Sequence, residues 1–333
     1  MYSGKAVGIL GTGICIPEKV LTNRDLEQIV DTSDEWIRTR TGIRERRVVE
    51  KGTPTSFLAE RAGRNAIQAA GISPGEIDLI ICATITPDML FPATACIVQD
   101  KIGAVSAAAF DLEAGCTGFV YALATAAQFV ASGVYKKVLV IGAETVSTIV
   151  DWEDRSTCVL FGDGAGAVVL GEVQKGYGIL GLDLGSKGSG SGLLTIPAGG
   201  SACPASESTI KNRLHFIHME GNEVFKFAVR IIGTSVIRAL KNSGLTMEDI
   251  DFLVPHQANI RIVEAALKRL KLPQEKVCIN LDRYGNTSAA SVPIALHEAI
   301  VEEKIEEGDI VVLVAFGAGL TWGSVVLRWG GTG

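Results

Sequence analysis

The sequence predicts an α/β protein that contains two copies of one strand-and-helix unit. Residues 8–11, 71–78 and 138–143 each return later in the chain as similar segments, at 178–181, 244–251 and 313–318. The paired segments lie 170, 173 and 175 residues apart. Such a near-constant separation indicates the duplication of one large unit, since short stacked repeats recur roughly every 20–50 residues.

The composition is that of a folded protein outside the membrane. Of the 333 residues, 47 % are hydrophobic and 20 % are charged, so a large core can form and disorder is not expected. The longest apolar runs are only as long as strands, and the N-terminus lacks the charged and apolar segments of a signal peptide. We therefore expect a cytoplasmic protein without a membrane partner. The net charge of −6 argues against nucleic acid as the ligand but permits a local basic patch.

Both copies open with a strand and continue with a helix. The strands are predicted at Val7–Gly11 and Tyr177–Leu182, and the helices at Ser56–Ala70 and Glu223–Leu240. In both helices the apolar residues recur every three or four positions, which gives each helix one buried face.

The rest of each copy alternates apolar strands with a second helix. Strands Leu79–Ala83 and Phe252–Val254 are almost wholly apolar, which suits a sheet covered on both faces. The second helices are predicted at Cys116–Ser132 and Ser288–Glu303. Two further strands complete each copy, at Val138–Ile141 and Ala167–Leu170 in the first and at Ile310–Ala315 and Ser324–Leu327 in the second.

Alternating strands and helices predict mostly parallel sheets with helices on both faces. The two halves, residues 1–174 and 175–333, should pack about a pseudo-twofold axis, with a ligand crevice at the carboxyl ends of the strands. The first half is longer than the second between its last two strands, over Glu144 to Asp163.

Two glycine clusters do not fit a nucleotide-binding site. Gly8–Gly13 leads into Pro17 without a helix, and Gly162–Gly166 precedes a strand, whereas the dinucleotide fingerprint must open a helix. The seven cysteines form no C-x-x-C pair, which predicts free thiols in a reducing compartment. The four histidines and the carboxylates show no metal-ligand spacing, and we expect no metal.

Cys116 is a candidate nucleophile. It lies between small residues directly before an amphipathic run, so its sulfur is predicted at a helix N-terminus. The helix dipole there would lower the thiol pKa and would make Cys116 the most reactive exposed thiol. A buried structural cysteine is an equally good interpretation of this position.

His256 and Asn286 are candidate partners of Cys116 from the second half. His256 follows an apolar strand, and Asn286 precedes the helix equivalent to the one after Cys116. The alternatives are a histidine without a chemical role and a plain helix-capping asparagine. The pseudo-twofold axis would bring all three residues to one crevice, where Phe316–Gly319 offers a backbone N–H for an oxyanion.

The chain resembles the β-ketoacyl-acyl-carrier-protein synthase III family. Members of this family are the initiating condensing enzymes of bacterial fatty acid synthesis and have the thiolase fold. The resemblance covers essentially the whole chain. Its most specific segments are residues 31–37, 39–46, 113–119, 161–167, 219–226, 255–259 and 285–291. It implies a thiolase-like fold with α/β/α/β/α layers and a homodimer.

The resemblance also implies an acyltransferase reaction and a role for each site residue. A starter acyl-CoA would acylate Cys116, and malonyl-acyl carrier protein would then be decarboxylated and condensed with it. Acetyl-CoA is the expected starter, with a branched or longer acyl-CoA as the alternative. His256 and Asn286 would hold the enolate oxygen, and the N–H groups of Cys116 and Ala318 would form the other oxyanion hole. Ala318 stands where some relatives have a third consecutive glycine. Coenzyme A is a substrate in this reaction, and no cofactor is implied.

Further residues take their expected roles from the same resemblance. Seven residues would bind coenzyme A: Thr32, Trp36, Arg40, Arg155, Gly221, Phe225 and Asn259. Four basic residues would dock the acidic carrier protein: Lys226, Arg261, Lys268 and Arg269. For these four, a solvated helix face is the alternative. Phe91 would cross a dimer interface to close the partner's acyl pocket, or it would be buried against its own subunit.

Rival members of the superfamily fit less well. Degradative thiolases have a second catalytic cysteine near the C-terminus, but residues 315–322 contain none. Elongating synthases have histidine where this chain has Asn286, and plant-type polyketide synthases are longer. A related acyl-CoA-primed ketosynthase of secondary metabolism, or a non-catalytic acyl-binding protein, stays as the alternative function.

Overall fold

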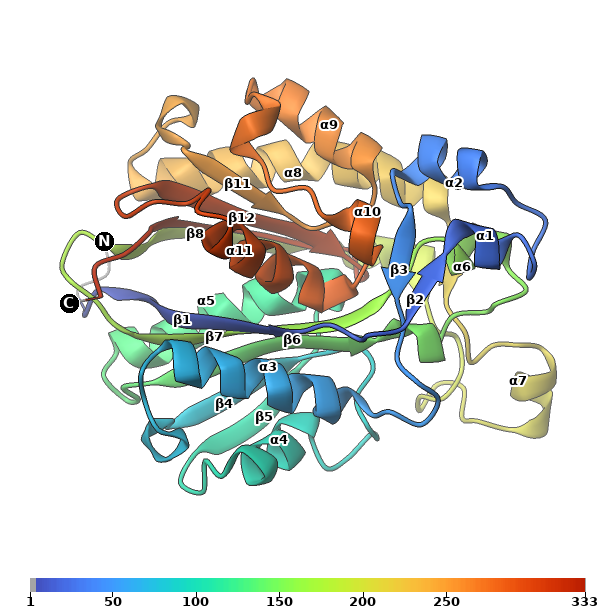
Figure 1. The fold of residues 1–333 in the computed structure, drawn as a ribbon, viewed down its shortest axis with the longest axis horizontal. Helices are drawn as coiled ribbons and strands as arrows, with labels where there is room; N and C mark the ends of the chain where they lie inside the picture. Colours follow the sequence, from blue (N-terminus) through green and yellow to red (C-terminus); the bar gives the residue numbers. More distant parts are fainter. Residues whose placement is uncertain (1–3, 333) are drawn as a thin grey trace.

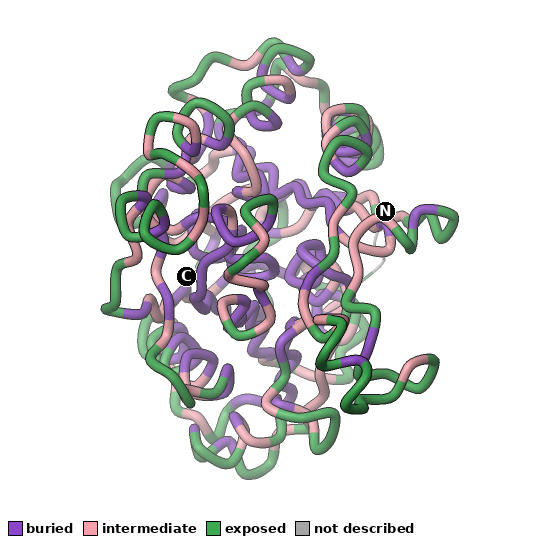
Figure 2. Tube along the Cα trace, turned by 90° about the vertical axis from the view of Figure 1, so that its right-hand side faces the viewer, coloured by how far each residue is buried: buried purple, intermediate pink, exposed green. Residues whose placement is uncertain are grey.

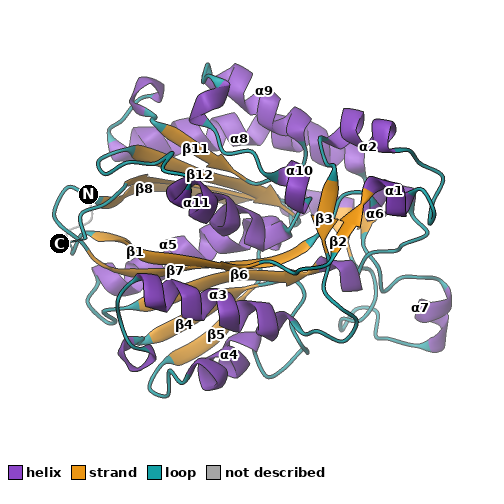
Figure 3. Ribbon diagram, in the orientation of Figure 1, coloured by secondary structure: helices purple, strands orange, loops and turns teal. Residues whose placement is uncertain are grey.

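A computed structural model describes residues 4–332, so residues 1–3 and 333 of the two predicted halves lie outside the described part. Two sheets lie one above the other, with two helices between them and two more on each outer face (Figure 1). This confirms the predicted α/β fold with α/β/α/β/α layers. Figure 3 shows the alternation of helix and sheet most directly.

The first sheet contains five strands in the order β1-β7-β6-β4-β5. Its strands are β1 (Val7–Cys15), β4 (Leu79–Ala83), β5 (Ala108–Leu112), β6 (Val138–Thr145) and β7 (Asp163–Glu172). The edge strand β5 and the helix before it, α4 (Thr94–Ile102), were not among the elements predicted from the sequence.

The second sheet contains four strands in the order β11-β12-β13-β8. Its strands are β8 (Gly178–Ser186), β11 (Phe252–Pro255), β12 (Ile310–Gly317) and β13 (Thr321–Arg328). All strands of the first sheet precede residue 175, and all strands of the second follow it.

The prediction of mostly parallel sheets is wrong. Strands β4, β5 and β6 are parallel, as are β11 and β12, but β7 and β13 run antiparallel to both of their neighbours. Strand β13 follows β12 after a three-residue turn. Such a short connection reverses the chain, whereas a parallel pair needs a crossover of a dozen or more residues.

Six long helices form the three helical layers. Helices α3 (Thr55–Ala69) and α4 cover the outer face of the first sheet, and α8 (Gly221–Ser243) and α9 (Ile260–Leu270) cover that of the second. Helices α5 (Gly118–Ala131) and α11 (Ser291–Val301) lie between the sheets. Both middle helices begin later than predicted, because the 3₁₀ turns Gly115–Thr117 and Ser288–Ala290 precede them.

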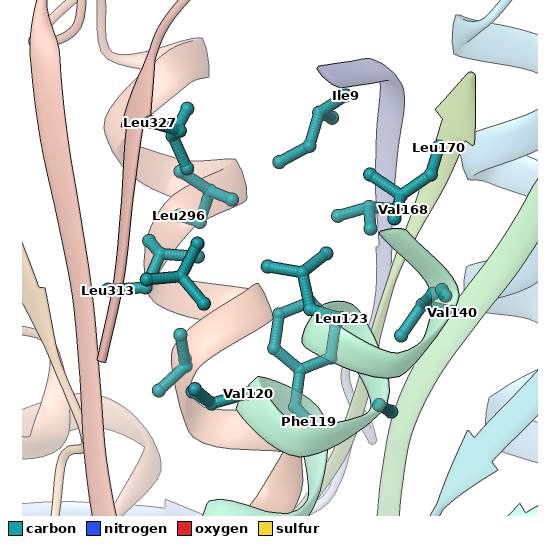
Figure 4. Close-up of a cluster of buried hydrophobic side chains, with 14 of the residues drawn as sticks. Ile9, Phe119, Val120, Leu123, Val140, Val168, Leu170, Leu296, Leu313 and Leu327 are labelled. Atoms are coloured by element: carbon teal, nitrogen blue, oxygen red, sulfur yellow. The ribbon is translucent and has the colours of Figure 1, made fainter. Parts of the chain in front are cut away.

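The middle layer is the centre of the core. Leu123 of α5 and Leu296 of α11 meet side chains of both sheets, among them Val168 and Leu313 (Figure 4). Burying a leucine of this kind stabilises the fold by about 1.5–3 kcal/mol. Exposed segments are confined to the outside of the molecule (Figure 2). Because the middle helices are rigidly packed, residues at their N-termini are held in fixed positions.

Short elements form a cap at one end of the two sheets (Figure 1). Strands β2 (Val20–Thr22) and β3 (Glu45–Arg47) pair with each other, as do β9 (Leu194–Thr195) and β10 (His218–Met219). The short helices are α1 (Asn23–Leu26), α2 (Asp34–Thr41), α6 (Arg155–Cys158), α7 (Glu207–Lys211) and α10 (Leu281–Tyr284). No helix within residues 4–332 is long and apolar enough to cross a membrane.

Candidate active site

Cys116 lies in the 3₁₀ turn between strand β5 and helix α5, and only 7 % of it is exposed. The preceding Gly115 has a φ of +56°, and a Cβ atom on it would lie 2.8 Å from the backbone nitrogen of Ala318. Glycine is therefore required at position 115 for two reasons, the backbone conformation and this close approach.

Burial raises the pKa of the Cys116 thiol to about 12. A neighbouring Ser288 hydroxyl and the residue's own N–H lower the pKa, but the charge of Glu144 raises it further. The prediction of a lowered Cys116 pKa is therefore wrong for the protein without substrate. Burying the thiolate costs more free energy than hydrogen bonds from the nearby donors recover.

Cys116 is also not the exposed thiol that the sequence suggested. Among the described residues, Cys96 on helix α4 is exposed, Cys15 and Cys203 are half-buried, and Cys116 is buried. A small reagent therefore reaches Cys96 more easily than Cys116.

His256 directly follows strand β11 and is 1 % exposed. Its backbone N–H donates to the carbonyl of Val314 over 2.8 Å. Its imidazole ring stands edge-on to the ring of Phe316, with 5.3 Å between ring centres. The ring Nδ1 lies 2.5 Å from the hydroxyl of Ser291. Burial lowers the pKa of His256 to about 3, so the imidazole is neutral at physiological pH.

Asn286 precedes the second 3₁₀ turn and is 6 % exposed. Its backbone bridges to the segment around Phe161, with its N–H donating to Leu160 over 2.8 Å and its carbonyl accepting from Gly162 over 3.0 Å. The side-chain Oδ1 accepts a hydrogen bond from the N–H of Ser288 over 2.9 Å. Because Oδ1 is occupied, the Nδ2 group is the free end of this amide toward a ligand.

These three residues lie around one cavity of about 100 Å³. Cys116, His256 and Asn286 all line it, together with Gly221, Phe225 and Asn259. A second cavity of about 250 Å³ also reaches Cys116, between Ile85, Phe161 and Ala318. Cys116 therefore lines both cavities.

The backbone segments of Cys116 and Ala318 are in close contact. A Cβ atom on Gly317 would lie 2.6 Å from the backbone nitrogen of Cys116. The glycines at 115 and 317 therefore allow the two N–H groups proposed for the oxyanion hole to approach each other.

Trp36 and Arg155 lie together on the cap. The guanidinium carbon of Arg155 is 5.1 Å from the centre of the Trp36 ring, and its Nη1 donates to the carbonyl of Asp31 over 2.7 Å. The hydroxyl of Thr32 is buried and has no hydrogen-bond partner among residues 4–332.

Asn259 links the cap to helix α9. Its Oδ1 accepts from the N–H of Arg261 over 2.9 Å, which caps the helix, and its Nδ2 donates to the carbonyl of Arg40 over 3.1 Å. Arg40 itself is exposed at the end of α2. Gly221 opens helix α8, and Phe225 lies one turn further along it.

The four basic residues expected to dock the carrier protein are all exposed on α8 and α9 but differ in their partners. Lys226 forms an ion pair with Glu223 over 2.6 Å, and the guanidinium carbon of Arg261 lies 5.4 Å from the Phe225 ring centre. Arg269 donates two hydrogen bonds to helix α8, to Arg230 and Thr234, each over 3.0 Å. Lys268 has no such partner among the described residues.

Phe91 is 84 % exposed, and the adjacent Leu90 is 85 % exposed. The alternative in which Phe91 is buried against its own subunit is therefore wrong. Two large apolar side chains in water at one loop indicate a contact surface.

Two polar residues near Cys116 were missed in the sequence. Glu144 and Ser288 are fully buried and hydrogen-bonded to each other. A glutamate at the end of the otherwise apolar run Val138–Ala143 was the available signal. Within residues 4–332, no group of three or more His, Cys, Asp or Glu side chains is arranged to hold a metal ion.

The fold and the candidate site are those of a condensing enzyme of the thiolase fold, an acyltransferase. Two family models match the chain, both describing 3-oxoacyl-[acyl-carrier-protein] synthase III, one over residues 110–188 and its C-terminal part over residues 240–329. The chain is 61 % identical to the beta-ketoacyl-[acyl-carrier-protein] synthase III of Caldanaerobacter subterraneus, over 97 % of this chain and 98 % of that protein.

Solved structures agree with these matches. The crystal structure of 3-oxoacyl-[acyl-carrier-protein] synthase III from Aquifex aeolicus has a TM-score of 0.89 at 49 % identity and covers 97 % of this chain and 100 % of that one. A priming β-ketosynthase from a polyketide pathway has a TM-score of 0.90 at 34 % identity, over 98 % and 97 % of the two chains. The chain belongs to the β-ketoacyl-[acyl-carrier-protein] synthase III family.

Proposed function

We propose that this enzyme joins a starter acyl group from acyl-CoA to malonyl-acyl carrier protein and so initiates fatty acid synthesis. The observation that carries the proposal is the convergence of Cys116, His256 and Asn286 on one cavity. The polyketide alternative has weaker support, because identity to the priming ketosynthase is 34 % against 61 % for the synthase III of Caldanaerobacter.

In the first half-reaction Cys116 takes the acyl group. The thiolate attacks the thioester carbonyl, a bond forms between sulfur and the acyl carbon, and coenzyme A leaves and receives the thiol proton. The N–H groups of Cys116 and Ala318 would hold the oxyanion, and their close approach supports this assignment. The cavity beside Ile85 and Ala318 would take the acyl chain, acetyl in the simplest case.

In the second half-reaction the malonyl group loses carbon dioxide. The electron pair of the broken C–C bond forms an enolate, whose carbon attacks the acyl carbonyl and releases the Cys116 thiolate. This step needs hydrogen-bond donors for the enolate oxygen and no external base. A neutral His256 and the free Nδ2 of Asn286 are suited to that role. The reaction needs no cofactor, because coenzyme A enters as a substrate.

For coenzyme A we propose the path from the cap to the cavity. Trp36 and Arg155 would separate from each other to receive the adenine ring, and the unpaired Thr32 hydroxyl would donate to the ligand. Gly221, Phe225 and Asn259 line the inner part, with Arg40 at the entrance.

Lys226, Arg261 and Lys268 are the proposed contacts for the acidic carrier protein. They are exposed on helices α8 and α9, both of which also contribute residues to the cavity that Cys116 lines. Arg269 fits this role less well, because its guanidinium group is hydrogen-bonded to helix α8.

We further propose a cytoplasmic homodimer. The edge strand β5 has no partner on one side within the described residues, and Leu90 and Phe91 are exposed in the same half of the chain. Pairing two copies at this edge would cover both features and bring Phe91 to the partner's acyl cavity. The substrates, acyl-CoA and acyl carrier protein, place the reaction in the cytoplasm.

The test is intact-mass spectrometry after mixing the protein with a panel of acyl-CoA thioesters, followed by malonyl-acyl carrier protein. We expect one acyl adduct per chain, lost on addition of the second substrate with release of a 3-oxoacyl product. The matched control is Cys116→Ala, which should give no adduct. An adduct on Cys116→Ala, or an acylated wild-type protein that forms no condensation product, would contradict the proposal.

A further inference from the structure

Glu144 is a buried carboxylate to which the proposed reaction assigns no role. It lies near the end of strand β6 and is 0 % exposed. No lysine, arginine or histidine within residues 4–332 forms an ion pair with it. Burial raises the pKa of Glu144 to about 7, and the hydrogen bonds that its side chain accepts lower the pKa. These hydrogen bonds are what allows a buried carboxylate without a cation to ionise.

Five donors from both halves of the chain converge on this carboxylate. Oε2 accepts from the hydroxyls of Thr84 and Thr86 over 3.2 and 2.7 Å and from the N–H of Ile85 over 3.1 Å. Oε1 accepts from the Ser288 hydroxyl over 3.0 Å and from the N–H of Ala289 over 3.4 Å. Glu144 therefore ties the loop after β4, which lines the acyl cavity at Ile85, to the turn that carries Asn286.

Ser288 is held in an unfavourable backbone conformation. Its φ is +49°, and it is the only buried non-glycine residue with a positive φ in the described part of the chain. Such a conformation costs free energy for a residue with a Cβ atom and persists only where surrounding contacts enforce it. The bond from the Ser288 hydroxyl to Glu144 is such a contact.

This conformation determines how the Asn286 side chain is oriented. The N–H of Ser288 donates to Oδ1 of Asn286 over 2.9 Å. With Oδ1 fixed in this way, Nδ2 is the end of the amide that remains for the cavity lined by Cys116 and His256.

We propose that Glu144 is a positioning residue for the decarboxylation half-reaction: through Ser288 it keeps the Nδ2 group of Asn286 directed at the enolate oxygen. This inference rests on the proposed function of Asn286. Glu144 itself touches neither substrate. The role requires a carboxylate, because both oxygens face backbone N–H groups: Ile85 donates to Oε2 over 3.1 Å and to Oε1 over 3.3 Å, and Ala289 donates to Oε1. A glutamine would turn its NH₂ group toward one of these donors in either orientation.

The test uses enzyme that has first been fully acylated, so that the rate of acylation does not enter the measurement. Glu144→Gln and Ser288→Ala are mixed with malonyl-acyl carrier protein, and single-turnover condensation is followed. We expect the maximal single-turnover rate to be roughly 10- to 100-fold lower than in wild type, with little change in the concentration of malonyl-acyl carrier protein that gives half of this rate. The matched control is Asp78→Asn. Asp78 directly precedes strand β4, at the end away from Ile85, and its carboxylate also accepts from backbone N–H groups. This variant should condense at the wild-type rate.

A double-mutant cycle separates positioning from general stability. If Glu144 and Ser288 act through Asn286, Ser288→Ala should slow the Asn286→Ala enzyme by less than about threefold, because the group to be positioned is gone. A crystal structure of Ser288→Ala should show the Asn286 amide turned. The proposal is overturned if the rate losses of Ser288→Ala and Asn286→Ala add fully in the double variant. It is also overturned if acylated Ser288→Ala condenses at the wild-type rate, or if Ser288→Ala cannot be acylated. Wild-type enzyme that failed to condense would instead refute the proposed function.

Discussion

The hydroxyl oxygen of Ser291 lies 2.5 Å from Nδ1 of His256. If His256 donates from Nε2 to the enolate oxygen, Nδ1 carries no proton and accepts from the Ser291 hydroxyl. Ser291 would then set the tautomer of the histidine, as an orienting group does in other catalytic histidines.

Ser291→Ala should therefore slow decarboxylation more than acylation. The substitution leaves Nδ1 buried without a partner and lets the proton move to it, which removes the donor at Nε2. We expect roughly a tenfold loss in condensation by acylated enzyme, or about 1.4 kcal/mol. Unchanged condensation in a folded variant would mean that Ser291 does not set the tautomer.

His256 should make stability depend on pH. Its folded-state pKa of about 3 is below the ordinary value of 6.5, so the unfolded chain binds the proton more readily. The contribution of this group to stability is present above pH 6.5 and is lost as the pH falls from 6.5 toward 3. Between pH 6.5 and 5 the free energy of unfolding should fall by about 1.5 kcal/mol through this group. Urea unfolding should show this loss in wild type and not in His256→Gln; equal pH slopes would argue against it.

Alkylation of Cys116 should be slow at neutral pH and accelerate with pH. Because the pKa is raised to about 12, the thiolate fraction should rise about tenfold per pH unit between pH 7 and 9. Limiting iodoacetamide should label the exposed Cys96 first. Peptide mapping at each pH gives both rates from one sample. If the alkylation rate of Cys116 did not rise with pH above 7, its thiolate would be stabilised more than burial predicts.

Asn286→Ala should separate the two half-reactions. Acyl transfer uses the sulfur and backbone N–H groups, whereas decarboxylation uses the Asn286 side chain, so the variant should still form acyl-enzyme. Loss of one such donor typically costs about 100- to 1000-fold, or about 3–4 kcal/mol, in the step it serves. Cys116→Ala should show the reverse pattern, with no acyl-enzyme and residual malonyl decarboxylation. Equal damage to both steps in Asn286→Ala would refute this division.

Phe91→Ala should widen the range of accepted starters. If Phe91, which is 84 % exposed, closes the acyl cavity of the proposed partner subunit, its truncation leaves space for a longer chain. Competition between acetyl-CoA and longer or branched acyl-CoA thioesters, read by intact mass, measures the change. The control is Val105→Ala, another exposed apolar residue in the same half of the chain, which should keep the wild-type preference. A Phe91→Ala dimer with the wild-type preference would exclude the gating role.

Much of the fold could be predicted because local patterns encode it. The duplicated segments, the amphipathic helices such as α3 and α8 and the apolar strand β4 were all predicted close to their observed bounds. Strand β5 and helices α4 and α9 were not, because β5 is a short edge strand and neither helix lies in one of the repeated segments. Strand direction was also missed, since it depends on connection length and on pairing between distant strands.

By itself the sequence determined the class of fold, the family and the residues Cys116, His256 and Asn286 as candidates. The fold class follows from the order of the repeated segments, the candidate residues from their places at the ends of predicted strands and helices, and the family from the resemblance of specific motifs. Only the tertiary structure decided the protonation of the site, because the pKa values of Cys116 and His256 depend on how completely the two halves exclude water around them. It alone also revealed Glu144 and Ser288 as partners, which lie 144 residues apart and meet only when the two halves pack together.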